Sequence, residues 1–468
     1  MNIGQGVPNH LNFNFGFVRA SVLFALTAGF AIAAHLSFTI GYDFNLSDGF
    51  YAFIQIHGHT QLLGWIGLLV MGISLHFIPR LSHSPIRSPS VLRRILILMS
   101  TGLALRILAG SILPYLAVAG FYYYLTSFLV ALSALLELAG IFFYLQTVIS
   151  VVKNSFRLSD AFNDVKPFIF MVFSGYFLYG IMNLALVTHM IIITDVVLDQ
   201  NWNEILTTVF LSMIILPISF VFSIRLFPLF FTVEPIKKSA KFLGYSYGIL
   251  ISLNIIFSVS GMFGLKNDFT NLLLLFGGAA ISSLMIYLIL SLRIMKLPTF
   301  NISFKKDRQE PVPIESENWQ LSQRWSNRSI RTAYIWLLIS AFLDIYSRIQ
   351  LLFGYDVDIG IDAIRHLQLL GFATTLVFGV GSKMIPGFIG GKRIYSGKAV
   401  AIVYWTILTA ATFRTLPLLL PFDFIEFIPY GEAAMVHMFS LSGIFGMLAI
   451  ALFGWNLHRT HQTVLNIN

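Results

Sequence analysis

The segment HTQLLGWIGLLVMGISLHFIPR occupies positions 59–80, and a second version, HLQLLGFATTLVFGVGSKMIPG, occupies positions 366–387. Ten of these 22 positions are identical, without a gap. Apolar bias alone produces matched Leu and Val, but it does not produce a matched His, Gln, Pro and two glycines in one register. The pair therefore predicts an internal duplication, with His59 and His366 at the heads of two equivalent helices.

The composition is typical of a protein embedded in a lipid bilayer. Hydrophobic residues make up 57% of the 468 residues and charged residues 11%, whereas soluble domains carry about 25% charged residues. A helix needs about 20 mainly apolar residues to cross a bilayer. Twelve stretches have that length: 19–41, 55–79, 92–114, 121–150, 167–193, 205–231, 242–264, 270–295, 330–353, 364–389, 398–420 and 430–456. Since only helices satisfy the backbone in lipid at this segment length, we expect an all-α polytopic membrane protein of about 12 transmembrane helices.

Charges in the loops predict the orientation. Basic residues follow the even-numbered helices: Arg80, Arg93, Arg94, Lys153, Lys166, Lys238 and Lys241. Acidic residues follow the odd-numbered helices: Asp43, Asp48, Asp195, Asp199, Asp356 and Asp362. The positive-inside rule therefore places both termini in the cytoplasm. The net charge of +9 reflects these inner loops, so we expect a lipid partner and no nucleic acid.

The chain contains no cysteine. This excludes disulfides, thiolate ligands, iron–sulfur clusters and c-type haem attachment. Any metal must therefore be held by His, Met or carboxylate side chains.

The duplication continues beyond the matched helix. Arg106 and Arg414 lie in the helices that follow, 308 positions apart, and the next helices share a Gly-Ile-Phe that begins at Gly140 and Gly443. We expect one membrane domain over 1–468, built from three quasi-repeated four-helix units. The expected limits are 1–150 for unit one, 160–296 for a divergent unit two, 297–329 for a cytoplasmic loop, and 330–460 for unit three. In the divergent unit, Thr208 stands at the position of the two histidines.

Six histidines fall in the outer layer of the predicted membrane region: His35, His57, His59, His189, His366 and His437. Ionisable residues inside lipid are costly and usually serve function, although outer-end histidines can also be hydrated interfacial residues. His59 and His366 are the strongest candidates, because each lies in the duplicated segment. His57 and His59 are about 200° apart around a helix, so both cannot bind one centre from a regular helix.

Other residues of the repeats have two interpretations each. The glycines of the matched segments, among them Gly64 and Gly371, indicate close helix packing or a flat macrocycle lying against bare backbone. Arg106 and Arg414 are suited to carboxylates such as haem propionates. Glu137, near the middle of its span, is a proton relay or a satisfied structural carboxyl.

The sequence His57-Gly-His59-Thr-Gln-Leu-Leu-Gly-Trp, closing on Phe-Ile-Pro79-Arg, resembles the second helix of haem–copper oxidase subunit I. It is more closely similar to the NnrS family of haem- and copper-containing membrane proteins, which are linked to denitrification and nitric oxide tolerance. The resemblance implies a bacterial inner-membrane protein. It also implies a b-type haem whose axial ligands are His59 (or His57) and His366.

The chain departs from the oxidase pattern in two places. Its sixth and seventh helices contain no histidine, and its tenth helix has only His366. The oxidase binuclear centre is therefore not supported in its usual position. For a copper ion, His35, His57, His189 and His437 are the candidates at the right depth, and imidazole suits copper as well as iron.

Three functions remain open. The first is an NnrS-like haem and copper protein that handles nitric oxide or another diatomic gas, with a possible redox partner. The second is a divergent oxidase or nitric oxide reductase subunit, in which Glu137 serves the proton path. The third is a transporter without metal, built from parallel repeats.

Overall fold

The computed structural model describes residues 13–86, 88–118, 120–155, 160–231, 235–236, 238–265, 267–296, 317–357, 359–391, 393–421 and 425–466. Within these ranges the chain is helical and contains no strand. Among the described residues, twelve helices are long and apolar enough to cross a membrane, which confirms the expected all-α, multi-pass class.

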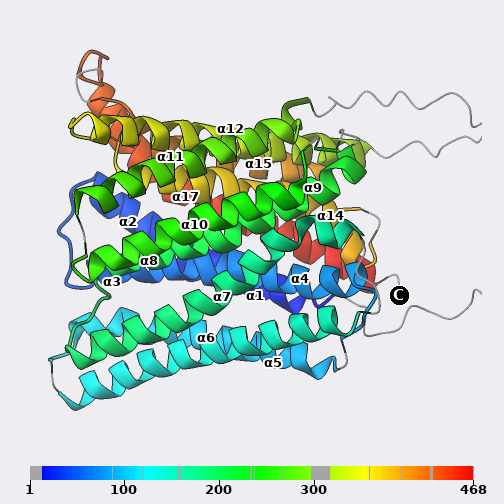
Figure 1. Cartoon of the computed structure of the whole chain (residues 1–468), viewed down its shortest axis with the longest axis horizontal. Helices are drawn as coiled ribbons and strands as arrows, with labels where there is room; N and C mark the ends of the chain where they lie inside the picture. The colour runs from blue at the N-terminus through cyan, green and yellow to red at the C-terminus, as the bar shows by residue number, and fades with distance from the viewer. Residues whose placement is uncertain are drawn as a thin grey trace, which may run out of the picture. The chain divides into compact units, whose positions relative to one another are not determined.

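The helices follow one another along the chain (Figure 1). They are α1 (Gly16–Phe24), η2 (Ala25–Ala31), α2 (Ile32–Gly41), α3 (Phe50–His59), η3 (Thr60–Gly67), α4 (Leu68–Leu81), α5 (Ser90–Ile112), η4 (Leu113–Tyr115), α6 (Phe121–Lys153), α7 (Asp160–Ile192), α8 (Gln200–Phe210), η5 (Leu211–Ile215), α9 (Leu216–Phe231), α10 (Ala240–Met262), α11 (Asp268–Ser291), η6 (Ile294–Lys296), α12 (Glu317–Leu352), α13 (Ile361–His366), η7 (Leu367–Thr374), α14 (Thr375–Phe388), α15 (Gly397–Leu419) and α17 (Gly431–Leu465).

Helix α12 begins earlier than the sequence predicts. Its first turns, from Glu317, lie inside the loop expected over 297–329, of which 297–316 fall outside the described residues. These turns are polar but they pack: Ser322 and Ser326 are buried. The side chain of Asn318 accepts a 2.6 Å hydrogen bond from the backbone N–H of Gly397. Contact with α15, rather than apolar sequence, therefore holds this extension of the helix.

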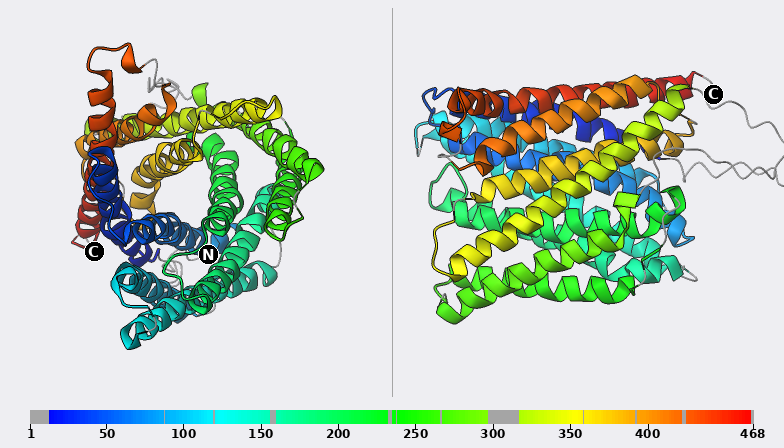
Figure 2. Two further views of the ribbon diagram at one scale, coloured as in Figure 1. Left: turned by 90° about the vertical axis from the view of Figure 1, so that its left-hand side faces the viewer. Right: turned by 90° about the horizontal axis from the view of Figure 1, so that it is seen from above.

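The chain divides into two compact units: residues 1–224 with 238–281, and residues 225–237 with 282–468. In the first unit α5 lies beside α6, α6 beside α7 and α7 beside α10, while α1 packs on η3 and α4 (Figure 1). In the second unit α12, α15 and α17 run side by side, and α12 and α15 both contact η7 (Figure 2). This division follows contacts, so the three predicted four-helix units stay a prediction.

In the described part of the chain four spanning helices contain a π-helical segment, and three of these segments, η3, η5 and η7, lie at corresponding positions. Segment η3 starts one residue after His59 and η7 starts one residue after His366, so both segments keep the 307-residue offset of the duplicated sequence. Segment η5 lies in the same window when Thr208 is aligned with the histidines. The duplicated sequence is therefore accompanied by a duplicated distortion of the helix, a feature that is frequent at functional sites.

In each of these three segments a side-chain hydroxyl donates to a backbone carbonyl. The hydroxyl of Tyr176 donates to the carbonyl of Gly67 in η3 at 2.9 Å. Tyr247 donates to Ser212 in η5 at 3.0 Å. In η7 the donor is Thr375, which reaches back to Leu370 at 3.2 Å. Because unsatisfied backbone groups are costly in lipid, these donors stabilise the π segments.

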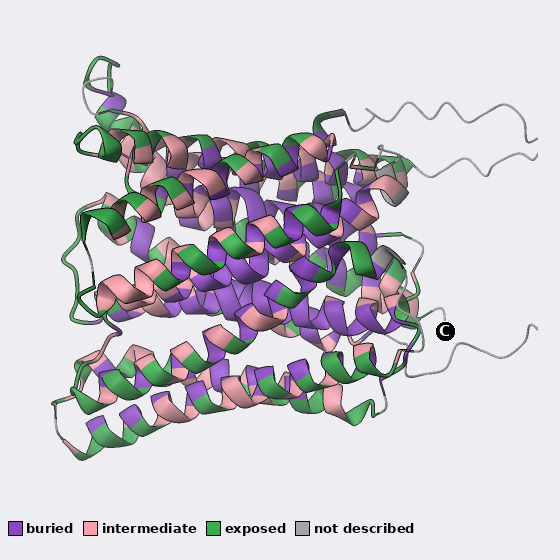
Figure 3. Cartoon of the chain, in the orientation of Figure 1, coloured by how far each residue is buried: buried purple, intermediate pink, exposed green. Residues whose placement is uncertain are grey.

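The repeat glycines pack against neighbouring helices. A Cβ added at Gly64 would lie 3.2 Å from Phe24, and one added at Gly72 would lie 2.5 Å from Phe17. In the second unit, a Cβ at Gly371 would lie 2.8 Å from Trp336. Aromatic side chains of the preceding span thus cover these glycines, which favours the packing role. Buried residues gather along α4, whereas the outward turns of α5 and α6 are largely exposed (Figure 3).

We predict that Gly72→Ala and Gly58→Ala have opposite effects. The Gly72 methyl group would overlap Phe17, so overpacking costs about 1–3 kcal/mol. At Gly58 nothing lies within 4 Å, and alanine gains up to about 1 kcal/mol of helix propensity. The midpoint of thermal unfolding in detergent measures both. A Gly72→Ala protein as stable as the Gly58→Ala protein would contradict this packing.

Candidate functional site

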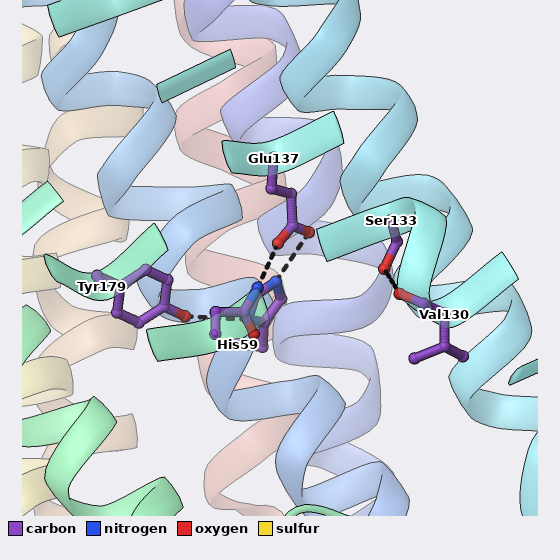
Figure 4. A network of polar contacts seen from close by, with 6 residues as sticks. His59, Val130, Ser133, Glu137 and Tyr179 are labelled. Atoms are coloured by element: carbon purple, nitrogen blue, oxygen red, sulfur yellow. Dashed lines mark hydrogen bonds and ion pairs between the residues drawn. The ribbon is translucent and has the colours of Figure 1, made fainter. Parts of the chain in front are cut away.

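A polar cluster lies inside the first unit, around His59 at the end of α3. The Nε2 atom of His59 lies 3.0 Å from Oε1 of Glu137 on α6. Its Nδ1 atom lies 2.9 Å from the hydroxyl oxygen of Tyr179 on α7. Figure 4 shows these two partners on either side of the imidazole ring. Both ring nitrogens of His59 are therefore engaged by protein side chains, and the exposed fraction of His59 is only 8%.

The hydrogen bonds have a consistent direction. A phenol beside an imidazole nitrogen donates its proton, so Tyr179 donates to Nδ1 and a neutral His59 carries its own proton on Nε2. His59 then donates to the Glu137 carboxylate. The Nδ2 atom of Asn183 donates to the other carboxylate oxygen of Glu137 at 3.0 Å. With each oxygen accepting a hydrogen bond, Glu137 is best satisfied as an ionised carboxylate.

Arg106 on α5 supplies the compensating positive charge. A Cβ added at Gly102, one turn earlier, would lie 2.8 Å from Cγ of Glu137, so α5 approaches α6 closely at this level. The guanidinium of Arg106 interacts electrostatically with Glu137 and Tyr179. Within the described residues its Nη1 atom has no hydrogen-bond partner. The cluster therefore contains one buried acid and one buried base, which balance each other.

The second copy of the repeat has different partners. The Nδ1–H of His366 donates to the backbone carbonyl of Asp362 at 2.7 Å. This bond fixes the tautomer whose lone pair is on Nε2, as is usual for metal-ligating histidines. The guanidinium of Arg414 stacks on Phe439, with Cζ 4.3 Å from the ring centroid. The indole N–H of Trp336 and the Nε–H of Arg414 have no hydrogen-bond acceptor in the described part of the chain.

The other four candidate histidines have contacts of their own. The Nδ1–H of His57 donates to the backbone carbonyl of Gly29 in η2 at 2.9 Å. His35 meets the ring edge of Phe53 and lines a cavity of about 320 Å³ at the end of α2. His189 lies near the end of α7, and His437 lies in the second turn of α17. Across the described residues, no three His, Asp or Glu side chains form a group that could hold a metal ion.

The two expected haem ligands differ in how well they fit the group. His366 fits better, because its Nδ1–H donates to a backbone carbonyl, the arrangement that orients most metal-ligating histidines. His59 does not fit as arranged, since a metal would have to displace Glu137 or Tyr179. Nor is there bare backbone beside it for a macrocycle, because Phe24 covers Gly64. The haem and copper expectations stay predictions, with His366 the better supported residue.

Tyr179 and Asn183 were missed by the sequence reasoning. They are four residues apart on α7 and so lie on one face of that helix. An Asn within an apolar span is a usable signal, because a buried amide needs partners inside the protein. The tyrosine carried no such signal, since the chain contains 18 tyrosines.

Comparison with known proteins adds no assignment: no family model matches the chain, and no curated protein matches its sequence.

We predict that Arg106 and Glu137 are coupled. Arg106→Gln leaves Glu137 buried without a compensating charge, so we expect it to destabilise the protein by about 1–3 kcal/mol. Adding Glu137→Gln recovers part of that loss, with a coupling energy of about 1–3 kcal/mol. Unfolding midpoints of the two single variants and the double variant test this.

Arg414→Gln is the matched control, because Arg414 stacks on Phe439 instead of facing a buried carboxylate. Adding Glu137→Gln to Arg414→Gln should not restore any of the lost stability. Simple additivity of Arg106→Gln and Glu137→Gln would refute the charge pairing.

Proposed function

We propose that the chain is an NnrS-like, b-type haem protein of the bacterial inner membrane that handles nitric oxide, with the iron held by His366. The observation that carries this proposal is the hydrogen bond from Nδ1 of His366 to Asp362 at the head of η7. It orients one imidazole as a ligand within a duplicated, π-distorted span.

The chain's own residues support a haem with one strong histidine ligand. The unmatched N–H donors of Arg414 and Trp336 are suited to carboxylates such as the haem propionates. His59 keeps its bonds to Glu137 and Tyr179 and does not compete for the iron. The haem that His366 would hold would supply binding of a diatomic gas. The proposal includes copper at His35, His57, His189 or His437, because imidazole suits copper as well as iron.

A second candidate is a divergent oxidase or nitric oxide reductase subunit. The observation that favours it is the Glu137–His59 pair, because such reductions consume protons and a buried acid beside an imidazole can pass them on. None of the described contacts favours the transporter without metal.

We expect purified protein to show reduced-minus-oxidised absorption bands of b-type haem. His366→Ala should abolish these bands, because it removes the oriented ligand. His59→Ala should retain them, and so should His57→Ala as a further control on the same span. Absence of haem from the wild-type protein would exclude both haem proposals and leave the transporter.

We expect the reduced protein to bind nitric oxide, with a shift of its haem absorption bands. Oxygen or nitric oxide consumption then divides the two haem functions: the reductase requires turnover that Glu137→Gln slows, whereas the gas-handling protein binds without consuming protons. Metal analysis of the wild type and of His189→Ala and His437→Ala tests the copper.

A further inference from the structure

We infer that Tyr179 is a redox-active tyrosine whose one-electron oxidation is coupled to proton transfer through His59 to Glu137. The three residues form a continuous chain from α7 through α3 to α6 (Figure 4). This activity assigns His59 a role other than that of an iron ligand.

The geometry meets the requirement for losing an electron and a proton together. A phenol that loses an electron becomes a strong acid, so its proton must have a base within hydrogen-bond reach. The base is Nδ1 of His59, 2.9 Å from the hydroxyl oxygen of Tyr179. Glu137, 3.0 Å from Nε2, can take up the second proton.

Bonds, protons and charge balance in this transfer among the three residues. The O–H bond of Tyr179 breaks, its electron passes to the oxidant, and its proton forms a bond to Nδ1 of His59. The Nε2–H bond of His59 breaks, and that proton forms a bond to Oε1 of Glu137. The products are a neutral phenoxyl radical, a neutral imidazole in its other tautomer and a neutral carboxylic acid. The charge of the three residues changes from −1 to zero, which equals the loss of one electron.

The surroundings protect such a radical. Tyr179 is 1% exposed and Glu137 is 1% exposed, so bulk water and reductants are kept away from them. The ring of Phe210 meets Tyr179 edge-on, with centroids 4.9 Å apart. Arg106 on α5 also interacts electrostatically with Glu137 and Tyr179, and Asn183 donates to the second oxygen of Glu137.

Neighbouring tyrosines provide a built-in comparison. Tyr176 is as deeply buried as Tyr179 and meets the same Phe210 ring, but its hydroxyl donates to the backbone carbonyl of Gly67. Tyr144, 5.3 Å from Tyr176 between ring centroids, shares a hydrogen bond with the hydroxyl of Ser74. Neither a carbonyl nor a serine hydroxyl can take a phenolic proton. Burial and aromatic contact are therefore similar, and the imidazole base distinguishes Tyr179.

The step needs a one-electron oxidant of high potential. Nitrogen dioxide, the radical formed from nitric oxide and oxygen, belongs to that class, and it is small and uncharged enough to enter an apolar protein interior. The choice of this physiological oxidant rests on the proposed function. The relay itself rests only on the contacts of Tyr179, His59 and Glu137.

Pulse radiolysis that generates nitrogen dioxide, followed by freeze-quenching and electron paramagnetic resonance, tests the inference on the full-length protein. We expect a tyrosyl signal in the wild type and in Tyr176→Phe. The signal should fall to background in Tyr179→Phe. It should also fall in His59→Gln, which keeps a hydrogen-bond acceptor but cannot carry the proton. Formation of the wild-type radical should slow in deuterium oxide.

An undiminished signal in Tyr179→Phe, or in a His59→Gln protein with a wild-type unfolding midpoint, would overturn the inference. Loss of the signal in Tyr176→Phe alone would also overturn it, because the radical would then reside on the tyrosine that has no base. The haem spectrum is an independent readout. If the protein lacks haem but still forms the Tyr179 radical, the proposed function is refuted and the relay is supported. If it contains haem but forms no radical, the relay is refuted and the proposed function is unaffected.

Discussion

A backbone carbonyl released inside a bilayer must find a donor within the protein, because lipid offers none. This constraint governs the three π-distorted spans that follow His59, Thr208 and His366. Buried tyrosines on neighbouring helices donate to a backbone carbonyl in two of these segments, and a threonine of the same span donates to one in the third. The two tyrosines tie α7 to η3 and α10 to η5 within the first unit, whereas the bond of Thr375 stays within its own span.

The charged groups inside the first unit are subject to the same constraint, because they too need partners within the protein. Glu137 is tolerated because His59 and Asn183 occupy its two oxygens and Arg106 compensates its charge. Removing any one of these groups leaves another unsatisfied. The cluster therefore behaves as a set, with the ring of His59 fixed from both sides by side chains on two other helices.

Sequence reasoning predicted the helical class, the twelve spans and the duplicated segment, because apolar length and matched polar residues are encoded locally. It singled out His59, Glu137 and Arg106 separately but did not join them. Their association depends on how α3, α5, α6 and α7 pack, which no single span reveals. The contacts of Tyr179 and Asn183 were hidden for the same reason. The early start of α12 at Glu317 was missed because contact with Gly397, and not apolar sequence, holds its polar turns in place.

The two equivalent histidines are oriented by different kinds of acceptor. His59 depends on the side chains of Glu137 and Tyr179, so a single substitution at either position would remove one of its two hydrogen bonds. His366 bonds to the main-chain oxygen of Asp362, which any residue at position 362 would supply. Evolutionary drift at that position would leave the imidazole in place. The orientation of His366 is thus robust to mutation, whereas that of His59 requires two other residues to be inherited with it.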